Sequence, residues 1–521
     1  MKRLKTTALA LTLSLALGAC AGDLGGGPRA ISSSNSSGSV SPMTAVPAGT
    51  VTPGTEPSQF VPPNDEPYDT VFFDNPGVNP FIDTEDDALS TFALDVDTGS
   101  YTIARRFLAD GFLPDKDSVR VEEYVNYFEQ DYPAPEQGLA VSVDGGPTPF
   151  TQNERNRVVR IGVQAAEPAE EERGPANLVF VVDASGSMDR EDRLGLVKEA
   201  LARLVANLRP DDTVGIVAYQ EHAWEVLQPT PASDPATILG ALHSLAPNGS
   251  TNAAEGLTLG YRMADEAFRE DGINRVILCS DGVANTGDAT GPESILELIR
   301  GASERSIELV TVGFGMGNYN DVLMEQLADQ GDGFYAYVDT LDEADRLFVD
   351  GLTGTLVTVA KDARIQVQFD PETVQSWRLI GFENRAMADE DFRDDSVDAG
   401  EIGAGHTVTA LYEIKPTDAT QGAFGSVYLR WLDPATNEAI EVEQPIERDL
   451  LADGFESTSP RFQQDVVVAQ FAEVLRESIW ARQTGSTLSD VAAVAQRLDT
   501  EGDPKLAEFV GLVQQAAAIS S

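Results

Sequence analysis

Three short clusters of oxygen-bearing side chains stand at separate places in the middle of the chain. The first is a D-x-S-x-S arrangement directly after an apolar run, with Asp183, Ser185 and Ser187. The other two contain Thr251, in an N-G-S-T sequence before a helical pattern, and Asp281, after a second apolar run. Hydroxyl and carboxylate oxygens are the ligands of hard divalent cations. These five residues therefore predict a metal site for Mg²⁺, with Mn²⁺ and Ca²⁺ as alternatives that the sequence does not separate.

The charge of this donor set predicts what the site does. Two carboxylates only neutralise a divalent ion and the hydroxyls are neutral, so the bound cation retains its attraction for a further anion. A Glu or Asp of another protein would supply that anion, and the contact would be stronger in a partly desolvated crevice than in open water. The predicted activity is metal-dependent capture of an acidic side chain of a partner protein. No catalytic residue is predicted, and the chain is expected not to be an enzyme.

The elements that must position these residues form a βαβ rhythm. Near-continuous apolar strands between amphipathic helices are typical of a parallel sheet that is covered on both faces. Residues 175–357 are therefore predicted to form an α/β domain with a doubly wound, mostly parallel sheet, and the clusters fall at strand carboxyl ends, where such sheets bind ligands. The expected strands are 178–182, 213–219, 275–279, 307–312 and 334–338, and the expected helices are 194–208, 253–268, 294–304 and 321–328.

β-rich segments flank the α/β domain on both sides. Apolar residues alternate with polar ones over 139–170 and again over 361–448, which predicts strands in both. Neither segment looks complete alone, so we expect them to pair in one β-sandwich-like domain, into which the α/β domain is inserted.

Helices are predicted at both ends of the folded part. Residues 66–138 carry two of them, at 103–108 and 119–128. Residues 459–521 form a helical tail in which three helices are expected. The first would run from Pro460 to about Arg482, and the others would open at Thr487 and Asp503.

The amino terminus predicts export and lipid anchoring. Residues 1–19 combine a basic start with a short apolar stretch, which is typical of a signal peptide. They end before Cys20 in a sequence that resembles a lipobox, so Cys20 is expected to be acylated. Residues 20–65, poor in large apolar residues, are predicted to be a disordered tether. We expect the protein in the cell envelope, attached by its lipid to the outer membrane or to the periplasmic face of the inner membrane.

Charge and cysteine content limit which partners the protein is expected to bind and whether it can form a disulfide. With 36 basic and 85 acidic residues the formal charge is −49, which disfavours binding to nucleic acid. Such a charge would also slow the approach of an acidic protein unless the contact patch is locally basic. Cys279 is the second cysteine, and its apolar surroundings predict a buried, inert thiol, so no disulfide is expected.

The five oxygen-bearing residues resemble the metal-ion-dependent adhesion site (MIDAS) of von Willebrand factor A (VWA) domains. Asp183, Ser185, Ser187, Thr251 and Asp281 match that motif one for one, and we call them the MIDAS residues. The resemblance implies that both Ser hydroxyls bind the metal directly. It also implies that the Thr does so in the ligand-competent state, and that the Asp residues act directly or through water.

Several segments outside the α/β domain resemble bacterial VWA lipoproteins of the YfbK-like type. The similarity covers nearly everything from about residue 75 onward and implies the architecture more than the cellular role. The segments that carry it are 79–81, 90–101, 122–128, 378–385 and 398–413.

Other candidate motifs in the chain are weaker evidence for a functional site. Asp97 lies in a D-T-G-S sequence like that of aspartic proteases, but the chain holds no second such motif to share a proton with it. His222, His243 and His406 are scattered, and the acidic run 389–395 is expected to be a solvated loop.

One alternative function is kept open. The protein would be a structural component of the cell envelope whose metal only stabilises the VWA domain. For the leading hypothesis, Ser185→Ala and Asp281→Ala are expected to abolish metal and partner binding while the fold survives.

Overall fold

The computed structural model describes residues 73, 76–94, 97–151, 153–168, 173–282, 299–302, 305–315 and 321–521. The predicted signal peptide, Cys20, the tether and most of the helix expected at 294–304 lie outside these residues. Within the described part of the chain, no helix combines the length and apolarity that crossing a membrane needs.

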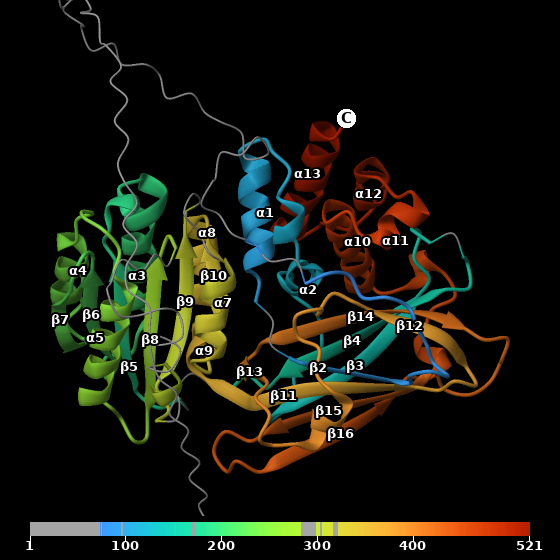
Figure 1. Cartoon of the computed structure of the whole chain (residues 1–521), viewed down its shortest axis with the longest axis horizontal. Coiled ribbons are helices and arrows are strands. Elements are labelled where there is room, and N and C mark those ends of the chain that lie inside the picture. The colour runs from blue at the N-terminus through green and yellow to red at the C-terminus, as the bar shows by residue number, and fades with distance from the viewer. Residues whose placement is uncertain are drawn as a thin grey trace, which may run out of the picture. The chain divides into compact units, whose positions relative to one another are not determined.

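The α/β domain is built on a six-stranded sheet in the order β10-β9-β8-β5-β6-β7 (Figure 1). Five strands are parallel, as the fold-class prediction required, and β7 runs antiparallel at the edge. The strands are β5 (Ala176–Asp183), β6 (Thr213–Tyr219), β7 (Ala223–Pro231), β8 (Ile273–Ser280), β9 (Glu308–Phe314) and β10 (Tyr335–Val338).

Helices cover both faces of this sheet, which confirms the doubly wound α/β class. In β5, Leu178, Phe180 and Val182 face one apolar core, and Val179 and Val181 face the other. Alternate strand residues point to opposite faces, so β5 needs an apolar residue at nearly every position. The helices are α3 (Leu196–Asn207), α4 (Pro235–Ser244), α5 (Ala253–Glu266), α7 (Asp321–Asp329), α8 (Leu341–Asp345) and α9 (Leu352–Leu356).

Four elements of this domain were not predicted from the sequence, namely β7, α4, α8 and α9. β7 is half exposed along its length, so it lacks the continuous apolar run of the inner strands. It is followed by α4, in which only Ile238 and Leu242 are buried. The helix expected from residue 194 begins earlier, with a π-helical turn at Glu191–Gly195.

The second domain is a β-sandwich whose sheets have the orders β1-β12-β14-β4-β3 and β13-β11-β15-β16, with β2 also paired to β11. β4 pairs antiparallel with β14, from Arg157 opposite Ile414 to Gln164 opposite Thr407. The strands before and after the α/β domain therefore share one sheet. The strands are β1 (Ile82–Asp83), β2 (Leu89–Ala93), β3 (Leu139–Gly146), β4 (Arg157–Ala165), β11 (Thr358–Phe369), β12 (Val374–Ile380), β13 (Gly400–Gly403), β14 (Thr407–Pro416), β15 (Gly425–Leu432) and β16 (Ala439–Pro445).

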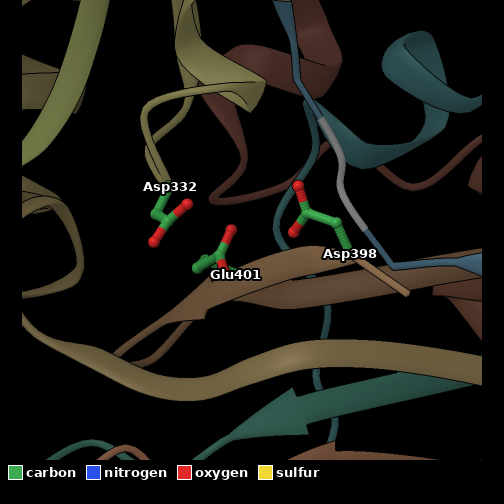
Figure 2. Close-up of side chains that lie close together, drawn as sticks. All are labelled: Asp332, Asp398 and Glu401. Carbon is green, nitrogen blue, oxygen red and sulfur yellow. The ribbon is translucent and has the colours of Figure 1, made fainter. Parts of the chain in front are cut away.

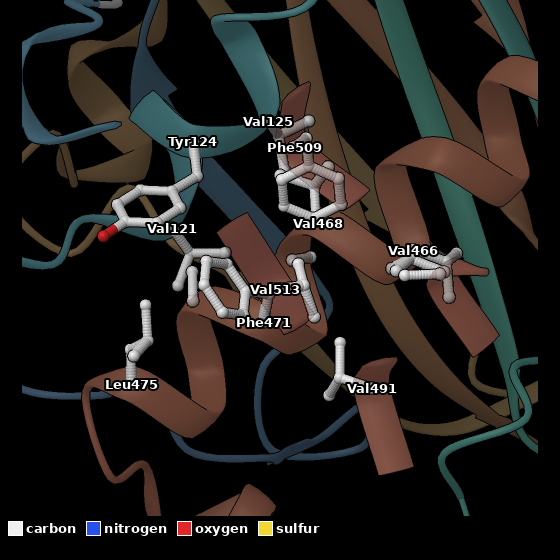
Figure 3. Close-up of a cluster of buried hydrophobic side chains, with 14 of the residues drawn as sticks. Val121, Tyr124, Val125, Val466, Val468, Phe471, Leu475, Val491, Phe509 and Val513 are labelled. Carbon is white, nitrogen blue, oxygen red and sulfur yellow. The ribbon is translucent and has the colours of Figure 1, made fainter. Parts of the chain in front are cut away.

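Helices from the two ends of the described chain pack into one further core (Figure 3). Tyr124 of α2 and Phe471 of α10 contribute rings whose centroids lie 6.3 Å apart. Phe471 and Phe509 meet edge to face at 5.6 Å. The helices of these two ends are α1 (Gly99–Ala109), α2 (Val121–Asn126), α10 (Pro460–Leu475), α11 (Ile479–Thr484), α12 (Leu488–Ala495) and α13 (Pro504–Ile519), and all but α11 contribute residues to this core.

The helical tail contains four helices, so the expectation of three was wrong. The first helix stops at Leu475 because Glu477 adopts a left-handed backbone conformation (φ 53°). Ser478 then caps α11 by accepting a hydrogen bond from the Ala481 amide. The predicted starts at Thr487 and Asp503 are confirmed, and Thr487 forms a reciprocal capping box with Asp490.

Candidate metal centre

Two adjacent parallel strands deliver the two MIDAS aspartates to one edge of the sheet. β5 ends at Asp183 and β8 at Ser280, and the strands pair in register up to Val182 opposite Cys279. The Ser280 hydroxyl donates a hydrogen bond of 2.8 Å to Oδ2 of Asp183. Asp281 follows directly, and both aspartates are almost fully buried.

The turn after β5 brings the two serines between these carboxylates. The Ser185 amide donates to Oδ1 of Asp183 at 2.8 Å. The Ser185 and Ser187 hydroxyl oxygens lie 2.9 Å apart, and Ser187 donates to Oδ1 of Asp281 at 3.0 Å. A 3₁₀ turn over Gly186–Met188 keeps the two hydroxyls on one side of the backbone.

The loop that carries Thr251 is fastened to the same turn by two backbone hydrogen bonds. The Asn248 amide donates to the Ala184 carbonyl at 2.8 Å, and the Gly186 amide donates to the Gly249 carbonyl at 3.0 Å. Gly249 has a φ of +71°, which favours glycine. Thr251 follows two residues later, with 8% of its surface exposed. The structure thus brings all three predicted clusters to one place.

The donor set fits an octahedral cation. Ligands about 2.1 Å from Mg²⁺ and at right angles to one another lie about 3 Å apart. The Ser185–Ser187 and Ser187–Asp281 oxygen separations, 2.9 and 3.0 Å, have that spacing. Oxygens of four residues could therefore hold Mg²⁺ or Mn²⁺, namely those of Asp183, Ser185, Ser187 and Asp281. Thr251 belongs to the loop that is fastened to the same turn, and its hydroxyl could supply a further ligand.

Burial makes the carboxylates costly to ionise in the absence of a cation. Desolvation raises the pKa of Asp183 to about 6, although hydrogen bonds from Ser185 and Ser280 partly offset it. Desolvation also raises the pKa of Asp281, against the opposing effect of Arg193. A bound divalent ion would favour the ionised forms of both groups.

Arg193, which was not singled out from the sequence, contributes a positive charge next to Asp281. Its Nη1 forms an ion pair with Oδ2 of Asp281 and donates to the Ser187 carbonyl at 2.8 Å. A Cβ at Gly315 would lie 2.5 Å from Cγ of Arg193, so glycine there leaves room for the arginine. A basic residue at the start of a helix is too common to have identified this role.

A second group of carboxylates lies at the other end of the α/β sheet (Figure 2). Oxygens of Asp332, Asp398 and Glu401 lie within 4.8 Å of one another. Asp332 precedes β10, whereas the other two belong to the segment around β13. Burial, followed by repulsion from Asp332, raises the pKa of Asp398 to about 6. This group was not predicted from the sequence, because its members are far apart along the chain.

The run 389–395 is more than the solvated loop that the sequence analysis expected. Asp389 accepts a hydrogen bond from Thr91 at 2.6 Å, and Asp395 pairs with Arg430 at 2.6 Å. Backbone carbonyls of Asp391 and Asp394 accept from the buried Arg364.

The remaining residues of interest have structural contacts. Asp97 is buried, accepts from the Tyr335 amide at 2.9 Å and pairs with Arg385 at 3.2 Å. His222 is exposed, with Glu255 3.3 Å away. Burial lowers the pKa of His406 to about 4 and raises that of the Cys279 thiol, as expected for inert groups.

Sequence comparisons identify the parts of the chain. The model of the von Willebrand factor type A domain matches residues 177–349, and a model described as von Willebrand factor matches residues 67–160. The model described as uncharacterized protein YfbK, C-terminal, matches residues 354–519. The uncharacterized protein YfbK of Escherichia coli (strain K12) is 35% identical over 472 residues, which cover 85% of this chain and 80% of that protein. The chain belongs to the YfbK family. This confirms the resemblance to YfbK-like VWA proteins.

More distant relatives of this YfbK-family protein share the VWA domain. Inter-alpha-trypsin inhibitor heavy chain H3 of Mesocricetus auratus is 31% identical over 178 residues, which cover 32% of this chain and 20% of that protein. The solved structure of a von Willebrand factor type A protein from Catenulispora acidiphila has 17% identity and a TM-score of 0.44, with 74% of this chain and 91% of that one covered. VWA domains commonly mediate metal-dependent protein interactions, so the YfbK-family chain carries a domain of the protein-binding type.

Proposed function

We propose that this YfbK-family protein captures an acidic side chain of a partner protein at its MIDAS, in a metal-dependent and non-enzymatic way. The observation that carries the proposal is the spacing of the Ser185, Ser187 and Asp281 oxygens, which is that of neighbouring ligands of one octahedral ion. A bound Mg²⁺ would supply a positive charge that accepts a carboxylate oxygen from outside.

The surface beside the MIDAS suits an acidic partner better than the chain as a whole does. A cavity of about 280 Å³ lies next to the D-x-S-x-S turn. Its wall contains the basic residues Arg190 and Lys198 and one acidic residue, Asp189, so its formal charge is positive, although the whole chain carries −49. A locally basic rim would lower the electrostatic barrier to an acidic segment. The residues that line this cavity are Met188, Asp189, Arg190, Leu194, Gly195, Lys198 and Pro247.

Affinity capture tests the proposal. The full chain would be used as bait against solubilised membranes, with Mg²⁺ or with EDTA, beside the variant Ser185→Ala. We expect one or a few proteins that require both Mg²⁺ and Ser185. Capture that persists unchanged in EDTA and in the variant would contradict the proposal.

The same comparison decides on the structural alternative. If the metal only stabilises the VWA domain, Mg²⁺ would raise the melting temperature of the wild type and no captured protein would depend on Ser185. We favour partner capture because the donor set contains only two carboxylates, one of them already paired with Arg193.

We also propose that the chain is anchored in the cell envelope by acylation of Cys20. The support is the lipobox-like sequence after a basic and apolar leader. Metabolic labelling with a fatty acid, beside Cys20→Ser, tests this proposal, and unlabelled wild-type protein would contradict it.

A further inference from the structure

We infer that Arg193 couples cation binding to carboxylate capture: it weakens the hold of the MIDAS on the cation alone and strengthens the hold of the loaded site on an acidic ligand. The inference rests on the proposed function and deepens it, because it assigns a residue outside the motif to the control of that site.

The first support is that the two carboxylate oxygens of Asp281 have different partners. Oδ1 lies 3.0 Å from the Ser187 hydroxyl, on the side of the other MIDAS oxygens. Oδ2 is paired with the guanidinium of Arg193. Asp281 can therefore face a cation with one oxygen while Arg193 keeps the other, so the arginine need not leave.

The second support is that Arg193 is fixed and shielded from water. Its side chain is 3% exposed and that of Asp281 is 1% exposed. The Ser187 carbonyl holds the guanidinium at 2.8 Å, and Gly315 lies against the side-chain stem. A charge held in such a place acts on its neighbours with little screening.

The charge count gives the direction of the effect. Asp183 and Asp281 contribute −2 and Arg193 contributes +1, so the loaded site with a divalent ion carries +1. A carboxylate from outside brings the sum to zero. Without Arg193 the loaded site is already neutral and gains less from the anion. By linkage, the factor by which a bound carboxylate raises the affinity for the cation equals the factor by which the bound cation raises the affinity for the carboxylate.

Arg262 offers a control in the same domain. It carries the same charge as Arg193, but it is exposed on α5 and belongs neither to the MIDAS nor to the cavity beside it. Water and salt screen an exposed charge, so Arg262→Gln should change cation affinity by less than about twofold.

Calorimetric titration of the full chain with Mn²⁺, in the presence and absence of acetate, tests the inference. In the wild type we expect acetate to tighten Mn²⁺ binding roughly tenfold. Arg193→Gln should bind Mn²⁺ roughly tenfold more tightly without acetate and should lose most of the acetate effect. Arg193→Lys, which keeps the charge, should behave like the wild type. A gain of affinity cannot come from a damaged fold, and Arg193→Met provides a second neutral variant.

The outcomes separate this inference from the proposed function. The role of Arg193 is refuted and the metal site stands if Mn²⁺ binding depends on Ser185 but acetate does not change it in the wild type. The same conclusion follows if acetate tightens Mn²⁺ binding equally in the wild type and in both neutral variants. If the wild type binds no Mn²⁺ with or without acetate, the proposed function fails.

Discussion

The MIDAS and the Asp332–Asp398–Glu401 group are both clusters of carboxylates, at opposite ends of one sheet, but they are built differently. At the MIDAS, hydroxyls separate the two aspartates and a buried arginine pairs with one of them. The other group consists of three carboxylates whose oxygens lie within 4.8 Å of one another, and Asp398 is exposed. The pKa is raised to about 6 both at Asp183 and at Asp398.

Desolvation is the largest cause of the raised pKa in both places, but the further causes differ. Asp183 is fully buried at a strand end, and its ionisation is opposed mainly by lost hydration. Asp398 lies where water can reach it, and its acidic neighbours add to a partial desolvation. What distinguishes the MIDAS is the pair of serine hydroxyls that a tight turn holds beside its two carboxylates.

The largest effect is expected from Asp281→Ala. The substitution removes a proposed metal ligand and leaves the buried Arg193 without its carboxylate, which typically costs about 3–5 kcal/mol. This changes the expectation drawn from the sequence, that the fold tolerates this variant as well as Ser185→Ala. Urea unfolding in EDTA would measure the loss. The double variant with Arg193→Gln should recover part of it, and an unaltered midpoint for Asp281→Ala would show that the ion pair is not important.

Ser185→Ala should abolish metal binding with little effect on the metal-free fold. Loss of a direct ligand is expected to exceed the roughly 10- to 100-fold reduction typical of an outer-shell residue. Asp332→Ala, at the other carboxylate group, is the control and should leave Mn²⁺ affinity unchanged. Calorimetry would distinguish the two, and an equal loss in both variants would remove the distinction between the regions.

Asp183→Asn should stabilise the metal-free protein while preventing metal binding. The folded-state pKa of about 6 exceeds the ordinary value of 3.8, so the folded form holds the proton more tightly than the unfolded form. The stability contributed by this group is therefore present below about pH 4 and is lost as the pH rises through 6. At pH 8 in EDTA the variant should gain on the order of 1–3 kcal/mol.

The same pKa predicts the pH dependence of metal binding in the wild type. Mn²⁺ must displace the proton of Asp183, so its affinity should fall as the pH drops below about 6. Titrations at pH 5 and pH 7.5 would show this, and a pH-independent affinity would contradict the burial argument.

The smallest effect is expected from Asp398→Asn. This residue is exposed, so solvent screening should limit the gain in stability at pH 8 to less than about 1 kcal/mol. The Mn²⁺ stoichiometry should stay at that of the wild type. A loss of bound Mn²⁺ in this variant would show that the two carboxylate groups are more alike than their construction indicates.

The sequence by itself determined the α/β class and most strand positions, and it selected the three clusters of oxygen-bearing residues that the folded chain brings to one place. Short continuous apolar runs between helical patterns indicate strands buried on both faces, and parallel strand ends at one edge bring distant motifs such as D-x-S-x-S and Asp281 together. It did not determine β7 or α4, whose half-exposed residues carry a weak pattern. It also did not predict the break after Leu475, which depends on a single left-handed residue.

Only the tertiary structure decided which charges meet. The Arg193–Asp281 pair joins residues 88 positions apart, and the Asp332–Asp398–Glu401 group joins two domains. Neither has a local signature, because Coulomb interactions depend on distance in space and on burial. The motif placed oxygens at strand ends, whereas the folded chain fixed the net charge that a cation would meet there.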